Sequence, residues 1–165
     1  MPRVANDVAA LVLRVCAGLI FLPHGWSKIA GAGGATAFAG DIAASYGIPA
    51  FLGHVAAWGE VAGGILLIVG LFTRLDALLL AVVMFVAAFV VQLPDALYEV
   101  PPGSIKLFVA VRGIELPLAM FAISAALLLT GAGRLSLDHL FGIDRRAAAL
   151  FGKKKAAAET AAAGV

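Results

Sequence analysis

The sequence has little of what most redox, metal and nucleic-acid sites are built from. Its 165 residues include one cysteine, Cys16, so an intramolecular disulfide and a Cys-x-x-C redox pair are both excluded. No haem, iron–sulfur or flavin motif is present, and we expect no metal site and no intrinsic cofactor. The basic residues lack the aromatic and folded context of a nucleic-acid-binding surface, so we expect no nucleic-acid partner. We expect Cys16 to be a small buried apolar residue.

Charged residues are also scarce. Asp, Glu, Lys and Arg make up 13% of the chain, against about 25% in soluble domains. Hydrophobic residues make up 62%, and the mean hydropathy is +1.03. This composition predicts an integral membrane protein whose helices contact the lipid bilayer.

Long apolar segments account for most of the chain. Each has about 20 residues, the length that crosses the hydrocarbon core of a bilayer as a helix. Their expected bounds are 8–29, 51–72, 75–93 and 109–130. Arg14 interrupts the first segment, which favours a retained membrane helix over a cleaved signal peptide. The pattern predicts an all-α membrane protein, a four-transmembrane-helix antiparallel bundle that forms one domain over residues 1–143.

The connections between these segments differ in length. Almost no linker separates the second segment from the third, which predicts a tight antiparallel hairpin. A short helix is expected over 35–46 and a turn-rich loop over 94–103. Residues 144–165 are first basic and then Ala-rich, and we expect them to form a mobile cytoplasmic tail.

Positive charge is unevenly distributed along the chain. Four spans place both ends of the bundle on one side of the membrane. The Lys and Arg residues expected on that side are Arg3, Arg74, Arg134, Arg145, Arg146, Lys153, Lys154 and Lys155. Lys28, Lys106 and Arg112 are expected on the other side. Because cytoplasmic loops carry the excess of Lys and Arg, we expect a multi-pass membrane protein with both termini in the cytoplasm.

The second segment carries a carboxylate, Glu60, within an apolar run. A charged side chain at this depth costs about 2.5 kcal/mol or more unless it is paired, protonated or in contact with water. Arg14, His24 and Lys28 follow one face of the first segment, and any of them could neutralise Glu60. The alternative is that Arg14 and Lys28 extend to opposite membrane interfaces.

A second pair of charges lies in the fourth segment. Arg112 and Glu115 are three residues apart, so they can form an ion pair with each other on one helix. The alternative is that Arg112 and Glu115 form one buried charge network together with the charged residues of the first two segments. The full set of that network is Arg14, His24, Lys28, Glu60, Arg112 and Glu115.

Small residues accompany the charges. Gly59 and Gly63 form a G-x-x-x-G pattern, which allows two membrane helices to approach closely. The glycines expected at helix–helix contacts are Gly18, Gly25, Gly59, Gly63 and Gly64. We therefore expect the polar face of segment 51–72 to pack inside the bundle.

Four pieces of the sequence, in order, resemble a known family. They are LRVCAGLIFLPHGWSKIAG, WGEVAGGILLIVGLFTR, RGIE and GAGRLSLD, and they cover residues 14–138. They resemble the DoxX family of small bacterial membrane proteins. The positions that the resemblance marks are His24, Gly25, Lys28, Glu60, Gly63, Gly64, Thr73, Arg74, Glu115, Gly133 and Asp138. Many relatives have a His at the end of the third segment, where this chain has Gln92, so a proton relay through that His is not expected here.

The resemblance implies a link to membrane redox chemistry. Family members are similar to a subunit of thiosulfate:quinone oxidoreductase, and others are linked to membrane complexes that handle oxidative or thiol stress. The first hypothesis is therefore a redox-linked, quinone-associated membrane subunit whose candidate catalytic residues are Glu60, His24 and Glu115. These groups are suitable because reduction of a quinone needs a proton donor near each carbonyl oxygen. The aromatic residues that could flank the quinone ring are Phe21, Trp26 and Trp58.

Two other functions remain open. The chain could be a structural or assembly accessory protein of a larger membrane complex, in which the buried ions only fix helix packing. A small transporter is the third hypothesis, and it rests on the same buried charges and on bends at Pro23 and Pro117. No inverted repeat is evident, so we rank it last. We expect membership of a larger redox-linked membrane complex, with electrons from a partner and no independent catalysis.

Overall fold

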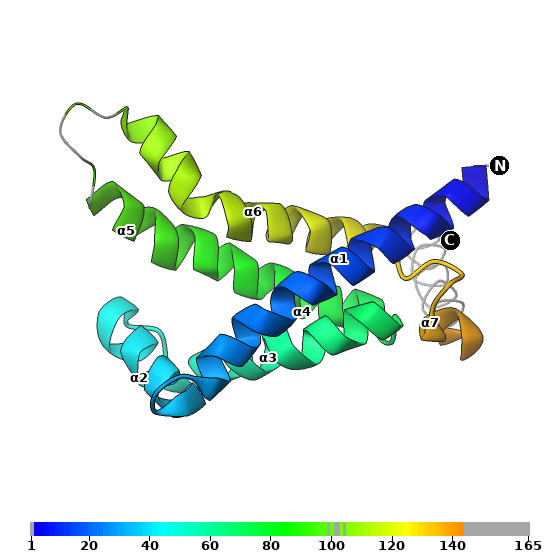
Figure 1. Cartoon of the computed structure of the whole chain (residues 1–165), viewed down its shortest axis with the longest axis horizontal. Helices are drawn as coiled ribbons and strands as arrows, with labels where there is room; N and C mark the ends of the chain where they lie inside the picture. The colour runs from blue at the N-terminus through cyan, green and yellow to red at the C-terminus, as the bar shows by residue number, and fades with distance from the viewer. Residues whose placement is uncertain (1, 99, 101–102, 104, 144–165) are drawn as a thin grey trace, which may run out of the picture.

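A computed structural model describes residues 2–98, 100, 103 and 105–143 of the chain (Figure 1). This part is helical apart from short connections, and it contains no strand. Its helices are α1 (Pro2–Ala30), α2 (Gly34–Tyr46), α3 (Ala50–Val69), α4 (Thr73–Val86), the π-helix η1 (Ala87–Gln92), α5 (Leu93–Tyr98), α6 (Lys106–Thr130) and α7 (Leu137–Leu140). The tail expected over 144–165 lies outside the described residues.

Four helical stretches in this part of the chain are long and apolar enough to cross a membrane. They are α1, α3, the continuous helix made by α4, η1 and α5, and α6. The prediction of an all-α membrane bundle with four spanning helices is confirmed. The protein is a multi-pass membrane protein, and the large apolar side chains on its outer faces, such as Leu75 and Leu129, contact lipid.

The third span is longer than the sequence predicts. Helical structure continues to Tyr98, so the loop expected over 94–103 begins later than residue 94. Pro94 lies directly after the π-helix within this continuous helix, and its missing N–H leaves a carbonyl of the preceding turn without its helical donor. The helix expected over 35–46 is present as α2.

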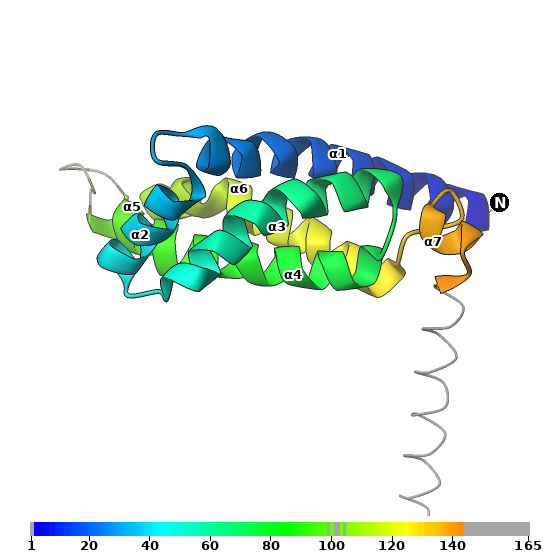
Figure 2. The ribbon, with the colours of Figure 1, turned by 90° about the horizontal axis from the view of Figure 1, so that it is seen from below.

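The spans run along the long axis of the molecule (Figure 2). α1 packs on α3, α4 packs on α6, and α2 lies against α3 at one end. The N-terminus and α7 lie together at the opposite end (Figure 1). There the Asp7 carboxylate accepts a 3.0 Å hydrogen bond from the backbone N–H of Arg134. The start of α1 and the end of α6 are therefore on the same side, as four antiparallel spans require.

Apolar side chains from all four spans form the core. They are Ala17, Phe21, Leu67, Ala77, Leu80, Met84, Met120 and Leu127. The prediction that Cys16 is buried is wrong, because this thiol is exposed. Cys16 lies outside the stripe of Arg14, Ala17 and Phe21, whose three- and four-residue spacing points one face of α1 into the bundle. Its neighbours on a membrane-spanning helix are therefore lipid chains.

Glycines bring the backbones of α1 and α3 into contact. A Cβ added at Gly18 would lie 2.5 Å from the carbonyl oxygen of Gly64. One added at Gly25 would lie 2.7 Å from the backbone nitrogen of Val61. Both distances are shorter than a Cβ can adopt, so the observed spacing of the two helices requires glycine at these positions.

Two other glycines of α3, Gly59 and Gly63, face α4. A Cβ at Gly63 would lie 2.6 Å from Oδ1 of Asp76, so the missing side chain leaves room for that carboxylate. A Cβ at Gly59 would lie 3.4 Å from Leu79, which is ordinary contact. Gly63 therefore matters for close packing, and Gly59 of the same G-x-x-x-G pattern matters less.

Asp138 holds the end of the bundle where the two termini of the domain meet. Its Oδ1 and Oδ2 accept hydrogen bonds of 2.7 and 2.8 Å from the backbone N–H groups of Phe72 and Thr73. Its own N–H donates to the carbonyl of Gly70 at 2.9 Å. These bonds satisfy the first N–H groups of α4 and stabilise the left-handed conformation of Phe72, which has φ +52°.

Two arginines bind backbone carbonyl groups at the same end, one in the last turn of α6 and one in the loop that follows it. Arg74 Nη1 donates to the carbonyl of Leu128 at 2.5 Å, and Arg14 Nη2 donates to that of Leu135 at 2.5 Å. Arg14 is fully buried. A cation at the C-terminus of α6 also suits the negative end of the helix dipole. Arg14 therefore reaches the loop after α6 at this end of the bundle, and its guanidinium group is enclosed by protein.

We expect Gly18→Ala to destabilise the protein, because the added methyl group would overlap the Gly64 carbonyl; such overpacking costs about 1–3 kcal/mol. Gly40→Ala is the matched control, since a Cβ there has no neighbour within 4 Å. Removing this helical glycine should be neutral or stabilising by about 0.5–1 kcal/mol. Thermal unfolding of the purified proteins in one detergent measures both effects. Equal midpoints for the two variants would contradict the close contact of α1 and α3.

Candidate functional site

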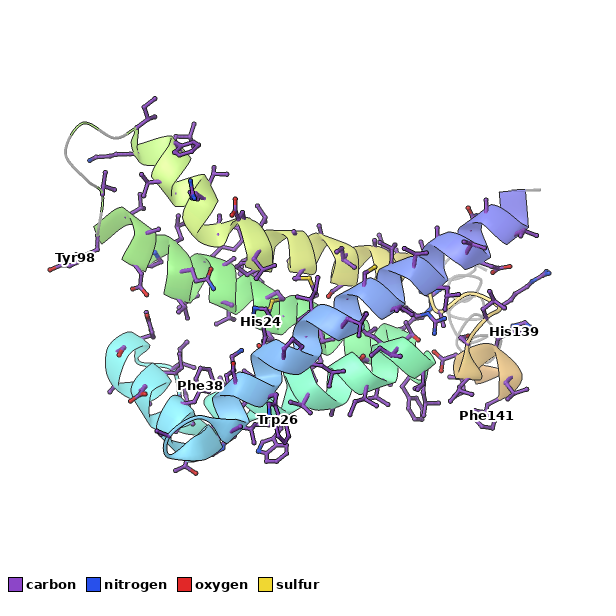
Figure 3. The ribbon with its side chains drawn as sticks, viewed as in Figure 1. His24, Trp26, Phe38, Tyr98, His139 and Phe141 are labelled. Carbon is purple, nitrogen blue, oxygen red and sulfur yellow. The ribbon has the colours of Figure 1, made fainter. Side chains whose placement is uncertain are left out.

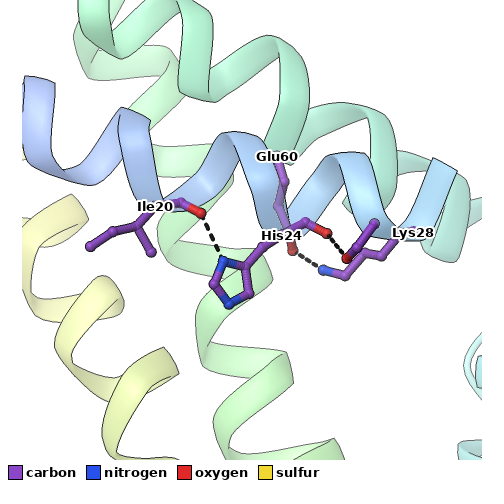
Figure 4. A network of polar contacts seen from close by, with 5 residues as sticks. Ile20, His24, Lys28 and Glu60 are labelled. Atoms are coloured by element: carbon purple, nitrogen blue, oxygen red, sulfur yellow. Dashed lines mark hydrogen bonds and ion pairs between the residues drawn. The ribbon is translucent and has the colours of Figure 1, made fainter. Parts of the chain in front are cut away.

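An ion pair joins α1 and α3 inside the bundle (Figure 4). The Lys28 ammonium group donates to Oε1 of Glu60. The Glu60 side chain is 1% exposed and that of Lys28 is 24% exposed. Of the three groups considered as partners of Glu60, Lys28 makes the direct contact. This contact supplies the compensating charge that a carboxylate at membrane depth requires.

The crossing of α1 over α3 places the two charged groups together. A Cβ at Gly25 would lie 2.9 Å from Cβ of Glu60, so the α1 backbone passes directly beside the acidic residue. Lys28 is three residues beyond Gly25 and therefore on the same face of α1. The glycine permits the approach, and the next turn of the helix supplies the cation.

His24 lies beside the ion pair without bonding to it. Its Nδ1 is 2.7 Å from the carbonyl oxygen of Ile20 (Figure 4). A carbonyl can only accept, so Nδ1 carries a proton and donates it to this contact. The hydroxyl of Ser27 donates to the His24 carbonyl at 2.8 Å. The imidazole is thus held in one orientation at the edge of the bundle.

The short helix α2 also contributes to the site. Nζ of Lys28 lies 5.3 Å from the centroid of the Phe38 ring. At this distance the ring face attracts the ammonium group. Lys28 therefore contacts a carboxylate on one side and an aromatic ring on another, and these contacts connect α1, α2 and α3.

Two cavities adjoin the ion pair. The larger has a volume of about 330 Å³ and is lined mainly by apolar side chains of α2, α3 and the third span. The smaller has about 140 Å³ and lies between α1, α6 and the third span, with His24 in its wall. Four residues line both cavities: Lys28, Glu60, Ala87 and Gln92. The polar groups of the site are therefore gathered where the two cavities meet.

The wall opposite Lys28 includes the π-helix. Ala87 and Gln92, the first and last residues of η1, line both cavities. A π-helical turn is widened by one residue, and such turns frequently occur at functional sites. The widened turn presents a half-buried amide to cavities that are otherwise mostly apolar.

Several residues expected at the site lie elsewhere. Trp26 and Trp58 are 62% and 55% exposed, and Trp26 points away from the bundle (Figure 3). Neither tryptophan lines a cavity, whereas Phe21 is buried in the wall of the smaller one. Arg112 and Glu115 are both exposed, and they line neither cavity. The structure thus corrects their assignment to a buried charge network, and the ion pairs of the described residues include none between them.

Asp76 is a buried acidic residue that the sequence did not single out. It is 5% exposed, and its carboxylate fills the space left by Gly63, which is one helical turn from Glu60 on α3. Its position in the first turn of α4 is typical of a surface residue that complements a helix dipole, so its burial could not be predicted from the sequence. The bundle therefore contains two buried carboxylates in neighbouring turns.

A further polar contact closes the end of the bundle that carries the cavities. The Tyr46 hydroxyl of α2 donates a 2.5 Å hydrogen bond to Oδ2 of Asp95 in α5. This bond, together with burial and the negative charge of Asp95, raises the pKa of Tyr46 above its ordinary value. Ile42 and Ile48, on either side of Tyr46 in the sequence, line the larger cavity.

Residues 9–93 match the DoxX family, which is just over half of the 165 residues. The chain belongs to the DoxX family. The matched DoxX region runs from α1 to the start of α5 and so includes Lys28, Glu60 and Gln92. The pieces RGIE and GAGRLSLD, which also resemble the family, lie beyond it.

A Bacillus subtilis (strain 168) protein named "Putative oxidoreductase CatD" is 39% identical to this DoxX chain over 87 residues. The alignment covers 53% of this chain and 62% of that protein's length. No solved structure matches the chain. Within the described residues, no three His, Cys, Asp or Glu side chains are grouped so that they could hold a metal ion.

We expect Lys28→Met to destabilise the protein, because Glu60 would remain buried without its cation. Breaking a buried ion pair from one side costs about 3–5 kcal/mol, whereas replacing both partners by apolar residues is often neutral. The double variant Lys28→Met/Glu60→Met should therefore recover most of the lost stability. Lys106→Met, at an exposed lysine, is the control and should unfold like the wild type. If thermal unfolding shows the double variant to be as unstable as the single one, the pairing is wrong.

The hydrogen bond of Tyr46 should depend on pH in a defined direction. A raised phenol pKa means that the bond is fully present below the ordinary value of about 10 and is lost as the pH rises through the higher folded value. Ultraviolet titration of tyrosinate in a Tyr98→Phe background isolates Tyr46, because the chain has two tyrosines. Adding Asp95→Asn should lower the titration midpoint. An unchanged midpoint would contradict the bond between α2 and α5.

Proposed function

We propose that this DoxX protein is a membrane subunit of a redox-linked complex and binds the ring of a quinone beside Lys28 and Glu60. The observation that carries the proposal is the position of the ion pair, at the junction of two mostly apolar cavities. A quinone has the matching chemistry, because it is an apolar ring with two oxygens that need hydrogen-bond donors. The larger cavity, of about 330 Å³, has the size of a small-molecule site, for which about 300–1,000 Å³ is usual.

The ion pair can take part in the proton chemistry of such a ligand. Reduction of a quinone to a quinol adds two electrons and two protons, one proton to each oxygen. The Lys28 ammonium group would stabilise the negative charge that develops on an oxygen when an electron arrives. Glu60 Oε2 is buried without a hydrogen-bond partner among the described residues. This oxygen can accept a proton when a quinol is oxidised, and the protonated acid can return that proton when a quinone is reduced.

His24 is the second group that could exchange a proton with the ligand. Its free Nε2 belongs to a side chain in the wall of the smaller cavity. Glu115, the third candidate from the sequence, is exposed and away from both cavities, and it has no role in this proposal. One carboxyl group and one imidazole therefore flank the junction where the ring would bind.

The electrons come from a partner protein in this proposal. The sequence carries no motif for haem, an iron–sulfur cluster or a flavin. The name of the Bacillus relative includes the word oxidoreductase, which supports an association with redox chemistry. This chain would contribute the quinone site and its protons, and the larger membrane complex would contribute the electron donor.

We place the protein in the bacterial cytoplasmic membrane with both termini in the cytoplasm. Arg74 and Arg134 lie at the end of the bundle that holds the start of α1. The sequence that follows residue 143 contains five further Lys and Arg residues. Lys28 and Lys106 lie toward the opposite end. The excess of positive charge at the first end supports this orientation.

An accessory role without ligand binding is the second candidate function. Asp138 and Arg74 are favourable observations, because these charged residues bind backbone groups and thereby hold helices together. Lys28 and Glu60 could likewise serve only to fix α1 on α3. The exposed apolar faces of the spans would then bind the other subunits of a membrane complex, and ligand binding would be absent.

Binding of decylubiquinone, a short-tailed benzoquinone, to the protein in lipid nanodiscs tests the proposal. We expect saturable binding above that of empty nanodiscs. For the reduced quinol form, binding by Glu60→Gln should be at least tenfold weaker, because an amide oxygen accepts a weaker hydrogen bond from the quinol hydroxyl than a carboxylate does. A tenfold loss corresponds to about 1.4 kcal/mol.

Glu115→Gln is the matched control, since it makes the same chemical change at an exposed residue outside both cavities. It should bind the quinone like the wild type. Binding no stronger than that of empty nanodiscs would overturn the proposal and favour the accessory role. Equal binding of the quinol by wild type and Glu60→Gln would remove Glu60 from the site.

A further inference from the structure

We infer that Gln92, placed by the π-helix η1, is the hydrogen-bonding residue that selects ligands with a ring carbonyl or hydroxyl oxygen. This inference rests on the proposed function and names a determinant of its specificity. Gln92 is one of four residues that line both cavities, and it approaches from the third span, whereas Lys28 and Glu60 come from α1 and α3. A ring at the junction of the cavities therefore has polar groups on two sides.

The geometry of η1 explains why Gln92 reaches this junction. In an α-helix, residues five apart are rotated by about 140° relative to each other, because each residue adds about 100°. Ala87 and Gln92 are five residues apart, and yet both line both cavities. The backbone N–H of Leu93 bonds to the carbonyl of Ala88, which is the i to i+5 pattern of a π-helix. The wider turn brings the two side chains toward one face.

The amide of Gln92 is available to a ligand. Its side chain is half-buried, and it makes no hydrogen bond with any of the described residues. Most of the surrounding walls consist of Val, Leu, Ile, Met and Ala side chains, which offer it no partner. A polar group in apolar surroundings costs free energy unless it is hydrogen-bonded, so a ligand that supplies the missing bond is favoured over one that does not.

The chemistry of an amide suits both redox states of a quinone. The NH₂ group of Gln92 can donate to a quinone carbonyl, and its carbonyl oxygen can accept from a quinol hydroxyl after the amide rotates. The amide does not change its own charge in either case. By contrast, Lys28 donates only, and its ammonium group is already engaged by Glu60 and the Phe38 ring. Gln92 is thus suited to recognise the oxygen, and the ion pair to exchange the charge and proton.

A pair of ring compounds of similar shape tests this assignment. Menadione is a naphthoquinone with two carbonyl oxygens, and 1,4-dimethylnaphthalene replaces those oxygens by methyl groups. Binding of both is measured for the full-length protein in nanodiscs, with empty nanodiscs subtracted. We expect the wild type to prefer menadione by at least tenfold. In Gln92→Met, which has a similar shape without an amide, that preference should fall to about twofold or less, mainly through weaker binding of menadione.

Two further variants control for other effects. Gln92→His restores a ring N–H donor and should retain most of the preference. Val90→Leu changes an exposed residue of η1 that lines neither cavity, and it should behave like the wild type. Gln92→Met removes an unpaired amide from apolar surroundings, so its thermal midpoint should be equal to or above that of the wild type. A lower midpoint would be expected if Gln92 were needed for folding.

The outcomes separate this inference from the proposed function. A wild type that binds both compounds equally, or neither, would refute quinone binding at this site and the inference with it. A wild type that prefers menadione together with a Gln92→Met variant that keeps the full preference would overturn the role of Gln92 alone. In that case Lys28 and Glu60 would carry the selection for ring oxygens.

Discussion

Close contact between two helix backbones is the constraint on which the site depends. Gly18 and Gly64 allow α1 and α3 to touch, and Gly25 extends the contact to the level of Glu60. Only at this separation can Lys28, one turn further along α1, reach the carboxylate. The buried carboxylate is stable because the Lys28 ammonium group compensates its charge. Lys28 is within reach because α1 and α3 have glycines where they cross. The same close contact of α1 and α3 therefore serves both the packing of the helices and the neutralisation of Glu60.

The two ends of the bundle use polar groups in different ways. At the end that holds α7, Asp138 and Arg74 bond to backbone groups at the termini of helices and satisfy hydrogen bonds that would otherwise be lost. At the other end, polar side chains meet one another across cavities, as Lys28 and Glu60 do, or across the gap between α2 and α5, as Tyr46 does. The first arrangement gives rigidity, and the second leaves space for a ligand.

Much of this fold could be predicted from the sequence, because membrane-spanning segments are recognised by their length and apolar composition. The four spans follow from long apolar runs, and the need of Glu60 for a cation follows from the cost of burying it. The choice of Lys28 over Arg14 could not be predicted, since both lie on one face of α1 and the crossing point decides. The π-helix could not be predicted either, because its residues have the composition of an ordinary helix. The sequence marks Gln92 only as the residue in place of a His of many relatives, and its position beside both cavities follows from the structure.

The fit of Asp76 against Gly63 has a consequence for how this protein can change. The carboxylate occupies the volume that a side chain at residue 63 would need, and Leu80 closes the same space from α4. The two positions are therefore coupled, and the effect of a substitution at one depends on the residue at the other. An evolutionary path that enlarges residue 63 first would press on both the buried acid and Leu80, whereas a path that shortens the acid first leaves only Leu80 to move. The absence of a Cβ at Gly63 therefore favours one order of substitutions at these two positions over the other.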